Sequence, residues 1–467
     1  MNDTQPATDG KTWPDYRAVW RWHFYASLLC IPFVIILTIS GAIYLFKEEV
    51  ETWQERPYDH LQVGGKPATA AAQIRAALAA VPDSTLEGYE LPKSGNAAAR
   101  VLVRQNGQAI RVYLHPETLA VLHTVPENDR FMGFVKKIHG ELLVGDRGSM
   151  VVELAASWTI IMIVTGLYLW WPRHARGFGG VLYPRLRGGS RMFWRDVHSV
   201  TGVWISSLAL FLLLTGLPWA KSWGTYFKAA RQLTGTAVAR QDWSSGSESG
   251  HVASGDGESG GHSGHEHGGG SGRRRSGRKT PKDLTAVDRI VATVRPLALP
   301  DPVVIAPPER GSTSWTAKSL TANRPQRVNL VVDGTTGDII SREDSRDRHL
   351  VDRVVAVGIA AHEGRLFGWP NQALGLLTAI GLDLMCVSGL ILWWRRRDQG
   401  VLGAPKVTLS PRISFGLIAL VVLFGIYLPL FGASLLAVLV VEKAILSRIP
   451  PLRHWLGLYV SETSVAT

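Results

Sequence analysis

The hydrophobic residues of this chain are concentrated in long blocks, and polar segments separate one block from the next. Four blocks are long enough to cross a hydrocarbon core of about 30 Å as single helices. These blocks cover Phe24–Phe46, Leu154–Trp171, Val200–Ala220 and roughly Gln372–Trp394. A fifth block follows, and Pro429 interrupts it. The pattern therefore predicts an α-helical integral membrane protein with about five spanning helices, or six if the fifth block forms two.

The fifth block, Ile413–Val441, can follow either of two courses. One long helix kinked at Pro429 would carry the C-terminus to the other side of the membrane. Two short helices would bring the C-terminus back, and from the sequence we favour the single kinked helix. The first block is too long for a signal-peptide core and lacks a small-residue cleavage site, so we expect it to remain as an anchor.

Two long polar segments, residues 47–147 and 222–367, have the pattern of folded α+β domains. Each begins with a stretch that predicts a helix and continues with short runs that predict strands. The first set is expected at Ala68–Val81, Tyr89–Pro92, Ala99–Arg104 and Ala109–Leu114. The second set is expected at Leu284–Val294, Val303–Ala306, Ser314–Ser319, Arg327–Val332 and Ile339–Ser341. Asn106-Gly107 and Asp333-Gly334 supply turns between strands.

The expected organisation alternates membrane helices with polar segments and passes through the same order twice. Its parts are an N-terminal stretch 1–22, helices 23–46 and 148–171 around the domain 47–147, a basic loop 172–197, helices 198–221 and 368–394 around the domain 222–367, a basic loop 395–412, the fifth block 413–445 and a tail 446–467. The second domain includes a Gly/Ser-rich insertion, residues 244–278, which is too polar to bury a core.

The formal net charge of +12 is concentrated in the two short loops, which argues against a nucleic-acid partner. The loop 172–197 contains six arginines and one acid, Asp196, whereas the loop 395–412 contains five basic residues and Asp398. By the positive-inside rule both loops face the cytoplasm. The N-terminus is then cytoplasmic, and both α+β domains lie on the outer side of the lipid bilayer.

Histidines recur at matched offsets in the apolar blocks. His139 and His362 are 223 positions apart, and each precedes a Gly-Leu-x-Leu-Trp-Trp run by 27 residues. His23 and His198 are 175 positions apart, and each precedes a glycine by 18 residues. These offsets indicate an internal duplication in which each type of helix has one histidine at a fixed depth.

The predicted topology sorts these histidines into two levels. His23 and His198 would lie near the cytoplasmic face, and His139 and His362 near the outer face. Two imidazoles that face each other in a helical bundle suit the axial positions of a b-type haem. We therefore predict two haem b groups, one near each face, that form an electron path across the bilayer. His174, at the end of the second helix, is an alternative ligand.

Other residues near the expected sites have two interpretations each. Arg21 and Arg195 could pair with haem propionates, as could Arg173 and Arg395, but arginines in such loops also simply set orientation. Small residues deep in the helices would let either a flat macrocycle or a neighbouring helix approach closely. These small residues are Gly41, Gly166, Gly216 and Gly389.

Three further features carry chemistry of their own. Asp383, an acid in the middle of a helix, could relay protons or contact a quinol, or it could be neutral and hydrogen-bonded to a hydroxyl. His262, His265 and His267 in the insertion could bind metal weakly or belong to a solvated linker. Cys30 and Cys386 fall inside helices, where we expect them to act as small apolar fillers.

Four segments of the chain resemble a known family: "WRWHFYASLLCIPFVIILTISGAIYLF", "KIHGELLVGDRGSMVVELAASWTIIMIVTGLYLWWPR", "RDVHSVTGVWISSLALFLLLTGLPW" and "AHEGRLFGWPNQALGLLTAIGLDLMCVSGLILWWRRR". They are similar to the PepSY-associated membrane-helix family of bacterial inner-membrane proteins, over about residues 15–400. The two outer domains look like periplasmic PepSY modules. The insertion and the fifth block depart from the shorter members of the family.

The family includes iron-regulated proteins and siderophore reductases. The resemblance therefore implies haem-dependent reduction of a ferric chelate or siderophore at the periplasmic side, with the matching histidines as haem ligands. A dinucleotide fingerprint is not visible in the sequence, so the donor would be a quinol or a cytoplasmic reductase. Two other functions fit part of the pattern: a PepSY-based module that modulates a periplasmic peptidase, and a transporter built from repeated helices.

Overall fold

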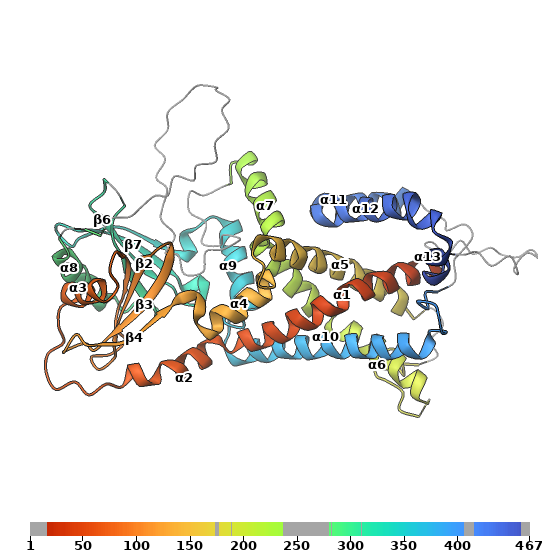
Figure 1. Ribbon diagram of the computed structural model, residues 1–467, viewed down its shortest axis with the longest axis horizontal. Helices are drawn as coiled ribbons and strands as arrows, with labels where there is room; N and C mark the ends of the chain where they lie inside the picture. Colours follow the sequence, from red (N-terminus) through yellow and green to blue (C-terminus); the bar gives the residue numbers. More distant parts are fainter. Residues whose placement is uncertain are drawn as a thin grey trace, which may run out of the picture. The chain divides into compact units, whose positions relative to one another are not determined.

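The computed structural model describes residues 16–172, 177–187, 189–236, 280–281, 283–309, 311–405 and 415–458 (Figure 1). The chain divides into two compact units. We call residues 1–42, 139–225 and 376–467 the helical unit, and residues 43–138 and 226–375 the sheet unit.

Long apolar helices form the helical unit. Within the described residues, four helices are long and apolar enough to cross a membrane, and they coincide with the four apolar blocks of the sequence. They are α1 (Tyr16–Leu45), α5 (Asp146–Trp170), α6 (Ser190–Gly216, extended by the short helix η2, Leu217–Trp219) and α10 (Trp369–Arg396). The protein is thus a multi-pass membrane protein, and each helix, at about 1.5 Å per residue, is longer than the apolar thickness of about 30 Å.

The fifth apolar block forms two helices, α11 (Phe415–Tyr427) and α12 (Pro429–Ala444), which lie side by side in Figure 1. Pro429 begins α12, where its missing N–H is not needed. Gly425 and Gly432 permit the close approach, because a Cβ on Gly432 would lie 3.1 Å from the Cα atom of Gly425. This is the second course that the sequence allowed, and it replaces the single kinked helix that the sequence favoured.

The segment after α12 lies against the segment that follows α10. The helices η6 (Leu446–Arg448) and α13 (Pro450–Trp455) follow α12. The N–H of Leu402 then donates to the carbonyl of Trp455 across 2.8 Å. The helices α11 and α12 pack against each other as a hairpin, and the bond between Leu402 and Trp455 joins the segments on either side of the fifth block.

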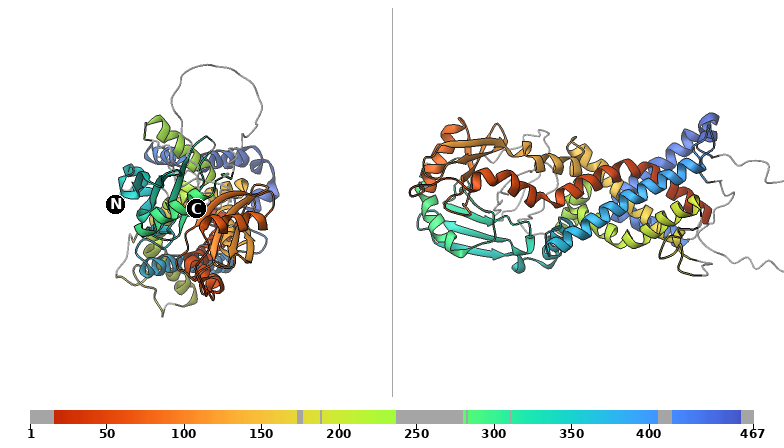
Figure 2. Two further views of the ribbon diagram at one scale, coloured as in Figure 1. Left: turned by 90° about the vertical axis from the view of Figure 1, so that its left-hand side faces the viewer. Right: turned by 90° about the horizontal axis from the view of Figure 1, so that it is seen from below.

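The sheet unit contains one antiparallel sheet of eight strands in the order β4-β3-β2-β1-β5-β6-β7-β8. Its strands are β1 (Thr85–Glu90), β2 (Ala99–Gln105), β3 (Gln108–Leu114), β4 (Val121–Pro126), β5 (Val303–Ala306), β6 (Ser314–Ser319), β7 (Val328–Asp333) and β8 (Ile339–Asp344). Each half is a meander, and β1 pairs with β5 at the centre, with Tyr89 opposite Ile305. The right-hand view of Figure 2 shows the two halves, orange and green, meeting in this sheet.

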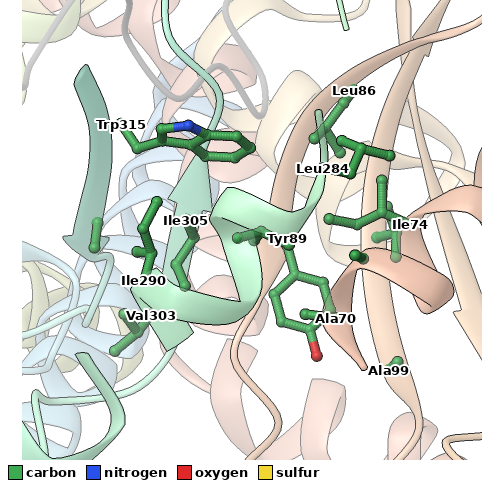
Figure 3. Close-up of a cluster of buried hydrophobic side chains, with 14 of the residues drawn as sticks. Ala70, Ile74, Leu86, Tyr89, Ala99, Leu284, Ile290, Val303, Ile305 and Trp315 are labelled. Carbon is green, nitrogen blue, oxygen red and sulfur yellow. The ribbon is translucent and has the colours of Figure 1, made fainter. Parts of the chain in front are cut away.

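The two α+β domains expected from the sequence therefore share a single sheet and a single core. The helices α3 (Ala70–Ala80) and α8 (Thr285–Val294) pack against each other and against buried side chains of both halves, including Ile74, Tyr89, Ile290 and Ile305 (Figure 3). Both helices come directly before the strands of their own half. A carboxylate oxygen of Asp288 accepts a hydrogen bond from the N–H of Ala71 across 3.0 Å. The negative charge of Asp288 thus lies at the N-terminus of α3, where it interacts favourably with the helix dipole.

The remaining elements complete both units. Four longer helices are α2 (Lys47–Asp59), α4 (Phe131–Glu141), α7 (Lys221–Leu233) and α9 (Leu350–His362). Four short 3-10 helices are η1 (Glu127–Asp129), η3 (Arg295–Leu297), η4 (Arg324–Gln326) and η5 (Ser345–Asp347).

Ion pairs lie on the face of the sheet opposite α3 and α8. Arg100 of β2 is fully buried and pairs with Glu55 and Asp59 of α2. Arg111 of β3 pairs with Glu90 and Glu127. Alternation along β2 and β3 directs these arginines away from the apolar core, since successive side chains point to opposite faces.

Candidate functional site

His23 on α1 contacts the neighbouring helix α5 through its Nδ1 atom. This nitrogen lies 3.1 Å from the hydroxyl oxygen of Thr165. The hydroxyl directs its own proton to carbonyls of its helix, at 2.9 Å from Ile161 and 3.0 Å from Met162. The ring of His23 also bonds to the Met162 carbonyl, which can only accept, so we assign the ring proton to Nδ1 with the Thr165 hydroxyl as a second acceptor.

His198 on α6 has the same relationship with α10. Its Nδ1 atom lies 3.2 Å from the Ser388 hydroxyl and 3.1 Å from the Met385 carbonyl. A carbonyl oxygen can only accept, so Nδ1 of His198 also carries the proton. The hydroxyl of Ser388 in turn donates to the carbonyl of Met385 across 3.1 Å.

His139 on α4 repeats this geometry on α1. Its Nδ1 atom lies 3.0 Å from the Leu37 carbonyl and 3.2 Å from the Ser40 hydroxyl. Ser40 donates its own proton to Ile36 across 2.7 Å. Three histidines are therefore held by one arrangement: a hydroxyl side chain and the carbonyl three residues before it.

A glycine directly after each hydroxyl residue completes the arrangement. A Cβ built on Gly41 would lie 3.0 Å from Cε1 of His139. On Gly166 it would lie 3.2 Å from Cε1 of His23, and on Gly389 it would lie 3.4 Å from Cε1 of His198. We call the hydroxyl residue, the following glycine and the carbonyl three residues earlier a histidine cradle. The glycines admit the imidazole itself, which neither interpretation from the sequence had foreseen.

The cradles define the chemistry of these rings. With the proton on Nδ1, the lone pair of a neutral imidazole is on Nε2, which is the nitrogen that can bind a metal. A second partner that fixes the tautomer and orientation of the ring is usual for metal-binding histidines. His23, His198 and His139 are half-buried, so each has the tautomer and the orientation of a ligand in a partly desolvated site.

The rings lie at two levels along α1. His23 and His198 are near enough to interact electrostatically, and their pairing at one level stays a prediction. The cradle of His139 includes Ser40, which follows His23 by 17 residues on the same helix. That spacing corresponds to about 26 Å of helix rise, close to the hydrocarbon thickness.

His362 is the last residue of α9 and is half-buried. It belongs to the sheet unit, whereas His139 belongs to the helical unit. Their pairing therefore stays a prediction. The sequence offers a fourth hydroxyl-glycine dipeptide, Thr215-Gly216, at the end of α6.

The two arginines proposed near the inner site have protein partners. Arg21 is buried and donates to the carbonyls of Pro405 and Gly457, the latter at 3.1 Å, and to the hydroxyl of Tyr25 at 3.2 Å. Arg195 is largely exposed and pairs with Asp196 at 3.0 Å. Arg21 thus anchors the segments around Pro405 and Gly457, and a propionate contact of either arginine stays a prediction.

Asp383 lies on α10 and is half-buried. Its carboxylate oxygen is 2.5 Å from the hydroxyl oxygen of Thr38 on α1. The carboxyl group therefore has the hydroxyl partner that the sequence offered as one of its alternatives, and this bond joins two of the membrane helices.

Cys30 and Cys386 are buried in one apolar cluster with Val34, which agrees with their expected role as fillers. The alternative ligand His174 lies outside the described residues, and so do His262, His265 and His267 of the insertion.

The cradle residues could have been found in the sequence. All four apolar blocks contain a serine or threonine directly before the glycine that lies at a matched offset from a histidine. The four dipeptides are Ser40-Gly41, Thr165-Gly166, Thr215-Gly216 and Ser388-Gly389. We used the glycine positions to align the blocks but gave no role to the hydroxyl residues. The offsets also could not show that a histidine of one helix type uses the dipeptide of the other type.

Comparison with known proteins agrees with this architecture. No curated protein sequence matches the chain. A family model described as the PepSY-associated TM region matches residues 20–396, which include three of the four long helices in full, most of α1, the sheet unit and the three cradles. The chain therefore belongs to the PepSY-associated TM region family.

Proposed function

We propose that the protein is a di-haem membrane reductase that moves electrons across the bilayer to an acceptor on the outer side. The single observation that carries this proposal is the histidine cradle, which occurs three times with the same chemistry. In each cradle the bonds to Nδ1 leave Nε2 as the metal-binding nitrogen. A histidine that served only packing would not need the same tautomer on three different helices.

The residues present fit haem b. Axial haem ligation requires neutral imidazoles whose Nε2 atoms face the iron from two sides. His23 on α1 and His198 on α6 would supply two such rings from different helices. His139, with His362 as its predicted partner, would supply the second level. The haem supplies one-electron chemistry, and the protein supplies ligand position, burial and the path between the two levels.

The proposed location is the bacterial inner membrane with the N-terminus in the cytoplasm. The basic segments that follow α5 and α10 support this orientation, since arginine and lysine are retained on the cytoplasmic side. Arg185 and Arg195 after α5, and Arg395 to Arg397 after α10, are examples. The sheet unit would then be periplasmic.

The proposed acceptor is ferric iron in a siderophore or another chelate. Hard oxygen ligands bind Fe(III) tightly, and one electron converts it to the more labile Fe(II). The proposed donor is a membrane quinol or a cytoplasmic reductase, which releases electrons to the level of His23 and His198.

Proteoliposomes test this proposal directly. The purified protein is reconstituted with a reduced short-chain quinol on one side and a ferric chelate with a ferrous-specific dye on the other. We expect dye formation in the wild type, and at least a tenfold lower rate in His23→Ala and His139→Ala. The matched control His60→Ala changes an exposed histidine of the sheet unit and should keep the wild-type rate. Equal rates in all four proteins would overturn the proposal.

A second function is favoured by the edges of the sheet. Residues of β4 and β8 are exposed, with Val121 at 47% and Ile340 at 56%. An exposed edge strand can pair with an extended peptide. A PepSY-based periplasmic module that binds or modulates a peptidase would use this surface and need no redox activity. Such a module predicts a colourless protein and peptide binding that His23→Ala leaves unchanged.

A further inference from the structure

Asp383 and Thr38 form a polar pair inside the apolar part of the helical unit. Both α1 and α10 are among the helices able to span the membrane. Thr38 is buried, and its hydroxyl oxygen is 2.5 Å from Asp383. Burial of a carboxyl group at such a position costs free energy, because hydrocarbon offers it no hydrogen bonds. Acids inside membrane helices therefore usually have a function.

The pair lies between two histidine cradles. On α1, Thr38 falls between Leu37 and Ser40, the two residues that hold His139. On α10, Asp383 precedes Met385, whose carbonyl holds His198, by two residues. One hydrogen bond therefore connects the helix that holds the histidine of one level with the helix that holds a histidine of the other.

The hydroxyl of Thr38 can satisfy either protonation state of the acid. It has a single proton and two lone pairs. Besides Asp383, it lies 2.8 Å from the Val34 carbonyl and 3.1 Å from the Ile35 carbonyl. An ionised Asp383 accepts the Thr38 proton. A protonated Asp383 donates to Thr38, which then turns its own proton to the helix carbonyls. The hydrogen bond between Thr38 and Asp383 can therefore be kept whether or not the carboxyl group is protonated.

The surroundings of the pair are otherwise weakly polar. Titratable groups near it in the described part of the chain include two thiols: Cys386, which interacts electrostatically with Asp383 on its own helix, and Cys30 of α1, which interacts with Cys386. The helix α6 contributes apolar Ile205 against Gly381. Negative charge that enters this region is therefore poorly screened, and a proton on Asp383 would offset it.

We propose that Asp383, paired with Thr38, is a redox-linked proton site that takes up one proton when an electron enters the pair of haem levels. This inference rests on the proposed function. For each electron that the quinol-class donor supplies, Asp383 takes up one proton from water. When the electron passes to the acceptor, Asp383 releases that proton to water. In this role Asp383 compensates the added negative charge and does not bind the iron.

A redox titration at several pH values tests the inference in the full-length, haem-loaded protein. The midpoint potential of the wild type should fall with rising pH, by at most about 59 mV per unit for one proton per electron. Asp383→Asn should remove most of this slope while keeping the haem spectrum. Cys386→Ala is the matched control on the same helix and should keep the wild-type slope.

Infrared difference spectra give a second measurement, whose main result comes from the wild type. Reduction of the wild type should add the carbonyl band of a protonated carboxylic acid, and Thr38→Val should weaken or shift this band. A pH-independent potential in the wild type, or an unchanged slope in Asp383→Asn, would overturn the inference. Absence of any haem spectrum from the wild type would overturn the proposed function instead, so the two failures are distinguishable.

Discussion

Gly41 and His139 are in direct contact, because a Cβ on Gly41 would lie 3.0 Å from Cε1 of the imidazole. The same relationship is looser at Gly166, with 3.2 Å to His23, and at Gly389, with 3.4 Å to His198. The last distance is ordinary van der Waals contact, whereas the first requires the ring to move. The three cradles therefore differ in how much they tolerate an added methyl group.

This graded contact predicts a graded response to alanine. Gly41→Ala should lower haem occupancy most, Gly166→Ala less, and Gly389→Ala least, because overpacking increases as the distance shortens. Haem content per polypeptide, measured after purification in the same detergent, checks the order. If Gly389→Ala were the most damaging and Gly41→Ala harmless, the glycines would not act through the histidine rings.

The hydroxyl groups should tune the ligands that they hold. Thr165→Val keeps the side-chain volume but removes the acceptor for Nδ1 of His23, and loss of such a partner typically costs 10–100-fold in metal affinity or activity. We expect a weaker retention of one haem and a changed low-spin electron paramagnetic resonance signal. Thr165→Ser should restore both.

Thr159→Val is the matched control, since this threonine of α5 bonds to the Ala155 carbonyl across 2.7 Å and to the Cys30 thiol, and neither partner belongs to a histidine cradle. It should leave the resonance signal of the wild type unchanged. Identical spectra for Thr165→Val and Thr159→Val would contradict a role for the cradle.

The sheet unit should lose stability in acid through Glu127. Although burial alone would raise the pKa of this carboxyl, the guanidinium groups of Arg111 and Arg130 outweigh it and hold the pKa below its ordinary value of 4.5. A lowered folded-state pKa stabilises the fold above the unfolded value, and this contribution is lost as the pH falls through the folded value. Glu127→Gln should therefore destabilise the sheet unit at pH 7 by roughly 2 kcal/mol.

Hydrogen exchange of β3 and β4 measures this effect. The wild type and Glu127→Gln should differ at pH 7 and converge as the pH falls through the lowered folded-state pKa of Glu127. A difference that persists unchanged into acid would show that Glu127 acts through packing and not through charge.

The C-terminal hairpin makes a topological prediction. Leu402 and Trp455 are bonded to each other, so the chain after α12 ends on the same side of the membrane as the segment after α10. A fluorescent protein fused to the C-terminus should be active in the cytoplasm, and a periplasm-dependent phosphatase fused there should be inactive. The opposite pair of results would restore the single kinked helix.

The sequence predicted the elements better than it predicted their partners. Apolar length located the four spanning helices, and alternation located most strands, although the exposed strand β4 (Val121–Pro126) was missed because its burial pattern does not alternate. The two domains form one sheet because β1 pairs with β5, with Tyr89 opposite Ile305. These residues are more than 200 positions apart, so local sequence patterns could not predict the pairing. The hairpin was misjudged because a proline permits both a kink and a helix start.

The candidate site shows the same division. Matched offsets grouped the histidines as a set, and the pairing of His23 with His198 stays a prediction. The hydroxyl and glycine that hold each ring were missed because they belong to a different helix from the histidine. Only packing of α1 against α5, and of α6 against α10, brings Thr165 to His23 and Ser388 to His198.

Haem stoichiometry is the most direct measurement of the central claim. The full-length protein, expressed with ample porphyrin precursor, should contain two b-type haems per polypeptide in a pyridine haemochrome assay and show a low-spin reduced-minus-oxidised spectrum. His198→Ala should retain one haem, and His60→Ala should retain two. A wild-type protein that is fully inserted in the membrane and contains no haem would contradict the account.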